Sequence, residues 1–267
     1  MKTILLGWND AKFLPKVLKS LYDQTEKVEV IYIDDESTDN SIEIARSFSA
    51  DVVVRLRRRN RVVSGFPILA ENVNAGLKYI TTNDEFFMVM PSDVVLEREY
   101  VSKMLKHFHD EPKLVIASGK IYNEETVLTA PRGAGRIYRL TFWNKYIKRF
   151  PQAFLWESYP VYKAQSLGYK TRSFSNIHIT SLRPSRLYKS TYGYAMKELG
   201  YRSLYAYYRC SLAFLNNPKI GFQMMRTYNN KLNPLDRELT VWIHQHQKPH
   251  LTHLLPNLKK FILTMMK

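Results

Sequence analysis

The sequence contains almost no cysteine and no long apolar run. Its 267 residues include a single cysteine, Cys210, which excludes a disulfide framework within the chain and fits a reducing compartment. No window offers the roughly 18 consecutive apolar residues that a membrane-spanning helix needs. Residues 1–8 turn polar too soon for a secretory signal peptide. From these absences we expect a cytoplasmic protein.

The glycine motifs of common nucleotide-binding proteins are also missing, because neither G-x-G-x-x-G nor the P-loop pattern occurs. Acidic residues are few: 24 Asp and Glu stand against 40 Lys and Arg, which gives a net charge of +16. Such a surface attracts nucleic acid, anionic lipid or phosphorylated substrates, and charge alone does not choose among them. A nucleic-acid-binding protein is therefore one hypothesis.

What the chain does contain is an alternation of strand and helix signals. β-Branched and apolar runs predict strands at residues 3–7, 28–33, 51–56, 85–90 and 113–118, with helices between them. This alternation is typical of an α/β fold with a mostly parallel sheet flanked by helices. The pattern changes after residue 120, and from residue 192 onward it is mostly helical. We therefore expect parts at 1–120, 121–190 and 191–267, the last helical and basic.

Carboxylates follow two of these strands. Asp34 and Asp35 end the second strand, and Asp93 comes just after the fourth. Because ligands bind at the carboxyl ends of parallel strands, Gly7, Asp35 and Asp93 should lie along one binding edge. Carboxylates there suit a metal-bound diphosphate, since Mg²⁺ and Mn²⁺ are commonly shared between carboxylates and substrate phosphates. Aspartate is also a common turn residue, so the Asp34-Asp35 pair alone fits a turn equally well.

Three further features bear on chemistry. The cationic run at residues 57–61 fits either a phosphate-binding loop or a solvated face. Glu157 lies among aromatic residues that would raise its pKa toward that of a general base, although spacing alone favours a surface or cap role. His178 is a candidate phosphate or metal ligand, although a lone histidine is more often structural.

Five segments carry a family resemblance by their order along residues 1 to about 185. They are Leu6-Gly7-Trp8-Asn9-Asp10, Ile33-Asp34-Asp35-Glu36-Ser37-Thr38-Asp39-Asn40-Ser41, Asn72-Val73-Asn74-Ala75-Gly76, Met90-Pro91-Ser92-Asp93 and Trp156-Glu157-Ser158. In this order they resemble the family 2 glycosyltransferases, which are inverting nucleotide-sugar enzymes of GT-A fold. The fourth segment stands at the place of that family's D-x-D motif, and the fifth at its acceptor-side Glu-Asp.

The resemblance implies roles for these residues. Residues 1–120 would bind the nucleotide sugar and residues 121–190 the acceptor. Asp35 would contact the nucleotide base, Asp93 would bind Mg²⁺ or Mn²⁺ on the diphosphate, and Glu157 would deprotonate the acceptor hydroxyl. The remaining assignments are Gly7, Asn9, Asp34, Arg61, Asn74 and Ser92 to the nucleotide sugar, and His178 to the metal.

The resemblance also implies an activity. The acceptor hydroxyl would displace the nucleoside diphosphate in one step and invert the anomeric carbon. The helical C-terminal part resembles that of members with lipid-linked or polymeric glycan acceptors, so an anionic membrane surface on the cytoplasmic side is a further expected partner. The basic amphipathic segment 254–267 could lie on a bilayer or dock on its own domain. Nucleic acid is not expected as a partner.

Two departures from the family pattern affect the site. Pro91 replaces the first Asp of D-x-D, which predicts weak or dispensable metal dependence. Ser158 replaces the Asp of the Glu-Asp pair, and serine is no base at neutral pH. Either Glu157 is the base, or the protein is a catalytically altered binding protein. The nucleic-acid hypothesis is disfavoured because the strand-end acids would repel phosphates unless a metal intervenes, and no nucleic-acid fold signature is recognised.

Overall fold

The computed structural model of the chain describes residues 1–55, 67–183 and 191–247. Its contacts form two compact units, one of residues 1–152 with 156–186 and one of residues 153–155 with 187–267. The division of the first unit at residue 120 stays a prediction. Arg61 and the helix predicted at 254–267 lie outside the described residues.

Within the described residues, one sheet of eight strands forms the first unit, in the order β3-β2-β1-β4-β7-β6-β8-β5. The strands are β1 Lys2–Gly7, β2 Glu29–Asp34, β3 Val52–Arg55, β4 Phe86–Pro91, β5 Val94–Leu96, β6 Leu114–Ile121, β7 Arg136–Arg139 and β8 Lys170–Ser181. The first four strands in this order come from the N-terminal half of the chain. Neighbours among them, β3 with β2, β2 with β1 and β1 with β4, pair in parallel. β7 runs antiparallel to both β4 and β6. The fold is the predicted α/β sheet, dominated by parallel pairs.

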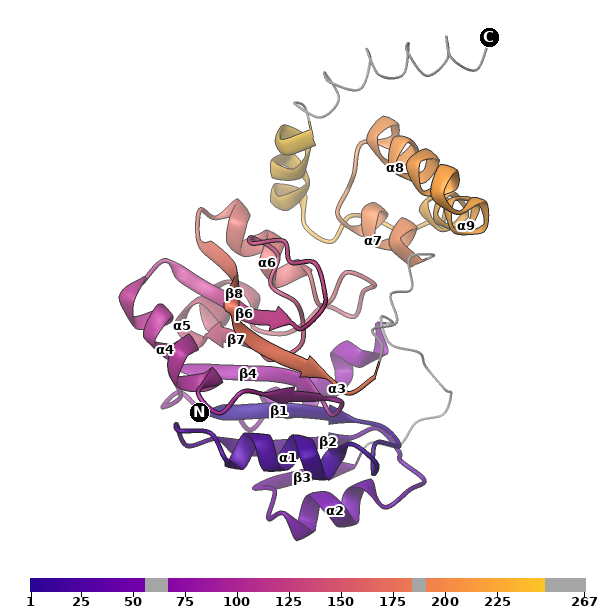
Figure 1. The fold of residues 1–267 in the computed structure, drawn as a ribbon. Coiled ribbons are helices and arrows are strands. Elements are labelled where there is room, and N and C mark those ends of the chain that lie inside the picture. Colours follow the sequence, from indigo (N-terminus) through magenta and orange to yellow (C-terminus); the bar gives the residue numbers. More distant parts are fainter. Residues whose placement is uncertain (56–66, 184–190, 248–267) are drawn as a thin grey trace. The chain divides into compact units, whose positions relative to one another are not determined.

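Helices cover both faces of this sheet (Figure 1). They are α1 Leu14–Tyr22, α2 Ser41–Ser47, α3 Ile68–Leu77, α4 Tyr100–Asp110, α5 Leu140–Phe142, the π-helical turn η1 Trp143–Ile147 and α6 Tyr159–Ser166. Side chains alternate between the faces: in β2, Val30 and Tyr32 belong to the core cluster that includes side chains of α1 and α4, whereas Ile31 and Ile33 belong to the cluster that includes side chains of α3 and α6. Burial on both faces explains why residues 30–33 of β2 are an unbroken apolar run in the sequence.

The C-terminal half of the sheet differs from the sequence prediction. β8 runs on to Ser181 because Ile177 and Ile179 in its second half are also fully buried, and a register shift at Gly119/Lys120 accommodates the residues between. β5 and β7 were not predicted. β5 has only three residues, and β7 carries arginine at both ends, so neither shows a strand pattern.

The second unit is helical, as predicted. It contains α7 Tyr192–Glu198, α8 Ser203–Asn216, α9 Pro218–Tyr228 and a helix at residues 237–247. α8 and α9 form a hairpin around a small core that includes the buried thiol of Cys210. Asn217 begins α9 by accepting a hydrogen bond from Ile220 N at 3.2 Å, with Pro218 in the first turn. Among the helices described, none combines the length and the apolar character needed to span a bilayer.

Candidate functional site

The ends of the central strands meet at one edge of the sheet. Gly7 pairs with Asp34, and Leu6 pairs with Pro91. The chain continues this alignment past the strands, since Asp35 N donates to Gly7 O at 2.9 Å and Ser92 N donates to Leu6 O at 2.8 Å. The predicted alignment of the strand ends is therefore present, with Asp34, Asp35 and the residues after β4 beside the end of β1.

Asn9 links the loop after β1 to the loop after β2. Its backbone lies in the left-handed region, with φ of 52°, which asparagine tolerates better than most residues. Its N–H donates to Ser37 Oγ at 2.9 Å, and its Oδ1 accepts from Thr38 N at 2.7 Å. In this structure Asn9 therefore shapes the edge by holding two loops together.

Asp39 makes a second link between the same loops. Its carboxylate accepts from Ala11 N at 3.0 Å and from Ser41 N at 3.1 Å, and also from the Ser41 hydroxyl. Burial acts to raise the pKa of Asp39, but these hydrogen bonds from Ser41 and Ala11 outweigh it and hold the pKa below its usual value. The loop contact consequently depends on the ionised carboxylate.

Asp34 and Gly7 pack tightly at this edge. Asp34 is fully buried, and its Oδ2 accepts from Ser37 N at 2.9 Å. A Cβ atom on Gly7 would stand 2.4 Å from the hydroxyl of Tyr32, so glycine is what lets β1 approach that ring. Burial and the nearby Asp34 carboxylate raise the pKa of Tyr32, which keeps the phenol neutral. Asp35 is buried beside them.

Arg183, just beyond β8, joins two carboxylates. Its Nε donates to Asp93 Oδ2 and its Nη2 donates to Asp10 Oδ1. The second oxygen of Asp10 accepts from the buried hydroxyl of Ser92. The guanidinium also lies 5.2 Å from the ring centroid of Phe13. Burial acts to lower the pKa of Arg183, but Asp93 and Asp10 raise it overall, so the side chain is a fixed cation at the edge.

The donor atoms here suit a hard divalent cation. Asp10 and Asp93 present carboxylate oxygens, the ligand type that Mg²⁺ and Mn²⁺ prefer, and the Asp93 side chain is 17% exposed. Across the described residues no three or more His, Cys, Asp or Glu side chains gather as a metal cage. One carboxylate with substrate phosphates and water is still a usual Mg²⁺ arrangement. Asp93 therefore fits the predicted metal role, with Arg183 competing for the same carboxylate.

His178 lies elsewhere on β8. It pairs with Lys120 in the ladder, and its Nδ1 is 3.9 Å from Glu97 Oε2. The recorded partners of Asp93 are Arg183 and, through its backbone oxygen, Leu182 N. The metal role of His178 stays a prediction.

Glu157 lies beside a buried arginine. Its Oε1 is 3.7 Å from Arg136 Nη2, and Arg136 also donates to the backbone oxygens of Glu157 and Pro131. A Cβ atom on Gly133 would fall 1.5 Å from Glu157 Oε1. Glycine at 133 thus leaves the space that the carboxylate occupies. The Glu157 side chain is 44% exposed, so it is held and yet reachable by a substrate.

A cavity of about 440 Å³ lies between the end of β6 and the end of β8. Its lining comprises Ile121, Tyr122, Asn123, Glu124, Ser181, Leu182 and Arg183. Arg183 thus borders it at the strand edge. On the other side Glu124 Oε2 pairs with Arg132 Nη2 at 2.7 Å, and Arg132 precedes the glycine that adjoins Glu157. A molecule in this cavity would contact both Arg183 and Glu124.

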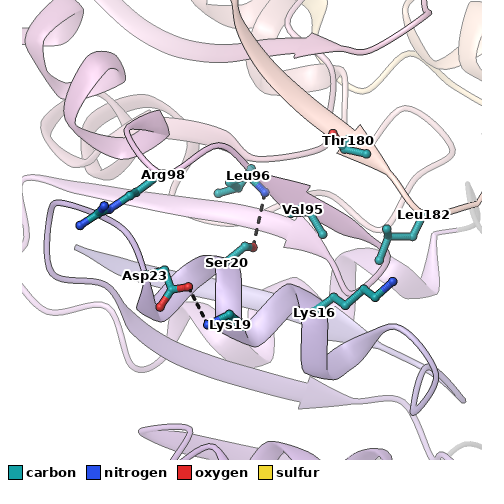
Figure 2. Close-up of a pocket in the computed structure, with 9 residues that line it drawn as sticks. All are labelled: Lys16, Lys19, Ser20, Asp23, Val95, Leu96, Arg98, Thr180 and Leu182. Atoms are coloured by element: carbon teal, nitrogen blue, oxygen red, sulfur yellow. Dashed lines mark hydrogen bonds and ion pairs between the residues drawn. The ribbon is translucent and has the colours of Figure 1, made fainter.

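A second groove, of about 470 Å³, lies between α1 and β5 (Figure 2). Figure 2 shows its two internal links: the ion pair of Lys19 with Asp23, and the hydrogen bond from Leu96 N to Ser20 Oγ. It shares Leu182 with the first cavity, but none of the predicted site residues lines it. The first cavity differs from it in being lined by Arg183, which bonds to Asp93.

Comparison with known proteins identifies the family. The model of glycosyl transferase family 2 matches residues 4–177, which is more than half of the chain. The chain belongs to glycosyl transferase family 2. This confirms the resemblance found in the sequence.

The relatives of this family 2 member agree on fold and class. Over 52 residues it is 46% identical to 4,4'-diaponeurosporenoate glycosyltransferase of Staphylococcus haemolyticus (strain JCSC1435), a match that spans 20% of this chain and 14% of that protein. Its structure resembles the mannosyltransferase PcManGT from Pyrobaculum calidifontis, solved with GDP-Man and Mn²⁺, with a TM-score of 0.59 and 15% identity over 98% of this chain and 80% of that one. It also resembles S. aureus TarS 1–349 in complex with UDP-GlcNAc, with a TM-score of 0.54 and 18% identity over 73% of this chain and 64% of that one. At these identities the structures establish the GT-A fold.

Two other predicted site residues of this family 2 member are engaged within the protein. Asn74 in α3 donates to Phe150 O and accepts from Phe150 N, both at 2.9 Å. The Ser92 hydroxyl bonds to Asp10. Contacts of either residue with a nucleotide sugar stay predictions, as does the assignment of Arg61.

Sequence reasoning did not assign site roles to Asp10, Arg136 and Arg183. Asp10 lies in the first resemblance segment. Arg183 follows the last strand directly and so falls at the edge that the fold predicts. Arg136 had no signal, because an arginine inside a strand gives no sign that it is buried.

Proposed function

We propose that this glycosyltransferase moves a sugar from a nucleoside diphosphate to a hydroxyl group of an acceptor, with inversion at the anomeric carbon. The observation that carries the proposal is the cavity bordered by Arg183. On one side of that arginine lie Asp93 and the strand edge with Asp34 and Asp35. On the other side the cavity reaches Glu124, which pairs with Arg132. Arg132 precedes Gly133, the residue that lies against the Glu157 carboxylate. A donor at the edge and an acceptor in the cavity would thus meet near Arg183.

The donor half of the proposal rests on charge. Asp34 and Asp35 would face the nucleoside, with Gly7 allowing its close approach. The diphosphate would lie toward Arg183, whose guanidinium can exchange its carboxylate partners for phosphate oxygens. When bound, Mg²⁺ or Mn²⁺ on Asp93 would neutralise charge on the leaving diphosphate. That PcManGT and TarS bind GDP-Man and UDP-GlcNAc supports a nucleotide-sugar donor for this fold.

The transfer step would be a single displacement. Glu157 accepts the proton of the acceptor hydroxyl as its oxygen forms the new bond to the anomeric carbon. The bond from that carbon to the diphosphate breaks on the opposite face, which inverts the centre. Arg136 and the space at Gly133 orient the Glu157 carboxylate, and Arg183 meets the negative charge that develops on the diphosphate. Ser158 takes no part as a base.

The acceptor would be a lipid-linked or polymeric glycan, handled at the cytoplasmic face of a membrane. The support is compositional: a net charge of +16 and 18 tyrosines suit an acceptor or a surface with phosphate groups. This part of the proposal is independent of the inverting step.

A thermal-shift panel tests the proposal. The full chain is heated with UDP-, GDP- and dTDP-sugars, with and without Mn²⁺, and with oligonucleotides. We expect one nucleotide sugar to raise the melting temperature, and Mn²⁺ to add to the rise in the wild type but not in Asp93→Asn. Stabilisation by oligonucleotides alone would instead establish a nucleic-acid-binding protein. Stabilisation by a sugar nucleotide without any turnover, across a range of glycan acceptors, would establish a catalytically altered binding protein.

A further inference from the structure

Helix α8 exposes apolar side chains opposite its buried face. Ala206 and Cys210 are fully buried in the core of the second unit. Leu204, Leu212 and Leu215 are 67%, 41% and 60% exposed. Their spacing of eight and three residues places them on one stripe of the helix, away from Ala206 and Cys210. A helix facing water normally carries polar residues on this stripe.

The apolar surface continues onto α9 at the turn of the hairpin. Phe214 and Phe222 are 47% and 63% exposed. A Cβ atom on Gly221 would lie 2.4 Å from the backbone of Phe214, so the two helices nearly touch there and bring both rings to the same end. We define the hairpin surface as Leu204, Leu212, Phe214, Leu215, Lys219, Phe222 and Arg226. Apolar residues scattered singly need no explanation, but a contiguous group marks an interaction site.

The charge of this hairpin has one sign. Residues 199–235 contain no Asp or Glu, and they contain five cations, Arg202, Arg209, Lys219, Arg226 and Lys231. All five are exposed. In α9, Lys219 and Arg226 stand three and four residues from Phe222, so they share its side of the helix. The complementary partner must therefore be apolar inside and negatively charged at its surface.

We propose that the hairpin surface docks on the face of an anionic lipid bilayer, with the leucines and phenylalanines among the acyl chains and the cations at the headgroup phosphates. A bilayer matches both properties at once, because amphipathic helices with apolar and basic residues lie in its interface. Tyr207 is exposed and Tyr201, Tyr205 and Tyr208 are half-buried in this segment, and aromatic rings with a polar tip favour the headgroup level. A protein partner fits less well. Specific protein interfaces use charges of both signs to fix register, so such an interface should include some acidic residues of the hairpin, and residues 199–235 contain none.

This surface is distinct from the segment 254–267, for which the sequence left open both a bilayer contact and docking on its own domain. The lipid contact proposed here assigns a surface to the membrane location already proposed. It does not depend on whether the protein transfers a sugar. Lipid binding without nucleotide or acceptor therefore tests it separately from the reaction.

The test is co-sedimentation of the full chain with vesicles of phosphatidylcholine, with and without phosphatidylglycerol. We expect the wild type to bind only the vesicles with phosphatidylglycerol. Leu215→Ser/Phe222→Ser should lower the partition coefficient roughly tenfold or more, because two apolar side chains no longer leave water. Lys219→Gln/Arg226→Gln should lower it roughly tenfold and weaken its salt dependence.

Matched variants in the first unit serve as controls. Leu128→Ser removes a leucine of similar exposure, 62%, and Lys27→Gln/Lys78→Gln removes two exposed cations; both should bind vesicles as the wild type does. Thermal unfolding checks that each variant folds. As a second readout, an environment-sensitive dye on Cys210→Ser/Phe222→Cys should shift to the blue with anionic vesicles, and the same dye on Cys210→Ser/Leu128→Cys should not.

Three results would overturn the proposal. Equal binding of the wild type and both hairpin variants would place membrane contact elsewhere, such as residues 254–267. Equal binding to neutral and anionic vesicles would remove the role of the cations. A change of oligomeric state in Leu215→Ser/Phe222→Ser, measured by light scattering without any change in vesicle binding, would assign the surface to a second copy of the chain.

Discussion

The guanidinium of Arg183 is hydrogen-bonded to the carboxylate of Asp93, the residue proposed to hold a metal ion. The same guanidinium bonds to Asp10. A positive charge therefore lies at the strand edge without any metal ion. If the proposed metal ion binds Asp93, it competes with Arg183 for that carboxylate, or Arg183 moves onto the phosphates of the proposed donor.

This competition predicts the effect of Arg183→Gln on metal binding. Removing the guanidinium frees the Asp93 carboxylate, so Mn²⁺ should bind the nucleotide-free protein more tightly. A partly exposed ion pair contributes about 1 kcal/mol, which corresponds to roughly fivefold in affinity. Electron paramagnetic resonance of free Mn²⁺ measures this directly. Sugar transfer should fall in the same variant, because the charge on the diphosphate loses a partner.

The matched control for this change is Arg132→Gln. Arg132 pairs with Glu124 and not with Asp93, so its removal should leave Mn²⁺ affinity unchanged. If Arg183→Gln bound Mn²⁺ no better than Arg132→Gln does, competition at Asp93 would be refuted.

The base assignment is tested by comparing two acids on the same side of the unit. Glu157→Gln should lower kcat by roughly 10²–10⁴, the usual contribution of a general base, while binding of the sugar nucleotide persists. Glu124→Gln, which removes the carboxylate that pairs with Arg132, should lower kcat far less. The measurement is steady-state transfer together with calorimetric donor binding. The reverse pattern would move the role of base to Glu124.

Gly133→Ala should harm activity without harming the fold. The new methyl group would occupy the place of Glu157 Oε1, which stands 1.5 Å from the ideal Cβ position, so the carboxylate must rotate away. We expect kcat to fall by about a hundredfold, as for other small misplacements of a reacting group. Stability should change by less than about 1 kcal/mol, because the pair with Arg136 is partly exposed.

Gly168→Ala is the natural contrast for this variant. Gly168 has a φ of 76° and no atom within 4 Å of its ideal Cβ position. Alanine there is strained by about 1 kcal/mol but touches no part of the site. We expect lower stability in chemical unfolding and unchanged kcat. Equal losses of kcat in the two variants would contradict a steric role for position 133.

Asp39→Asn should destabilise the first unit in a pH-dependent way. The pKa of Asp39 is held below its usual 3.8, so its ionised form stabilises the fold at pH values above 3.8. That contribution is lost as the pH falls through the lowered pKa of the folded protein. At neutral pH we expect a loss of about 1 kcal/mol, discounted for partial exposure. Urea unfolding of both proteins should show this difference shrinking below about pH 4.

A suitable control is Asp23→Asn, since Asp23 makes only an exposed pair with Lys19. It should change stability little at any pH. A difference between wild type and Asp39→Asn that stayed constant into strong acid would show that the loop contact does not need the charge.

The sequence was sufficient to predict the central strands and the edge that they build. Residues 30–33 of β2 are continuously apolar because both faces of the strand are buried. The run stops at Asp34 and Asp35, so the sequence indicates where the strand ends. Asp93 could be placed beside them because parallel strands joined by helices align their carboxyl ends. These features can be predicted from one sequence, because they depend on the periodicity of apolar residues and on the order of neighbouring strands and helices.

The contacts of Arg183 could not be predicted in the same way. Asp10 and Arg183 lie 173 positions apart, and no local pattern relates them. Arg136 is similar: its buried guanidinium is tolerated because Pro131 O, Arg132 O and Glu157 O accept its hydrogen bonds and the Glu157 carboxylate lies 3.7 Å away. Such partners are fixed by tertiary packing, so only the structure reveals them.

The path of the chain around residue 155 also affects how this protein can be divided. Residues 153–155 belong to the helical unit, where the buried carboxylate of Glu198 accepts from Phe154 N at 3.1 Å and Leu155 N at 2.8 Å. Glu157 follows two residues later. A catalytic fragment trimmed after residue 186 would lack Glu198, and the stretch just ahead of Glu157 would lose its acceptor. A version of the protein shortened in this way therefore removes the acceptor of Phe154 N and Leu155 N, two backbone groups that lie within four residues of the proposed base Glu157.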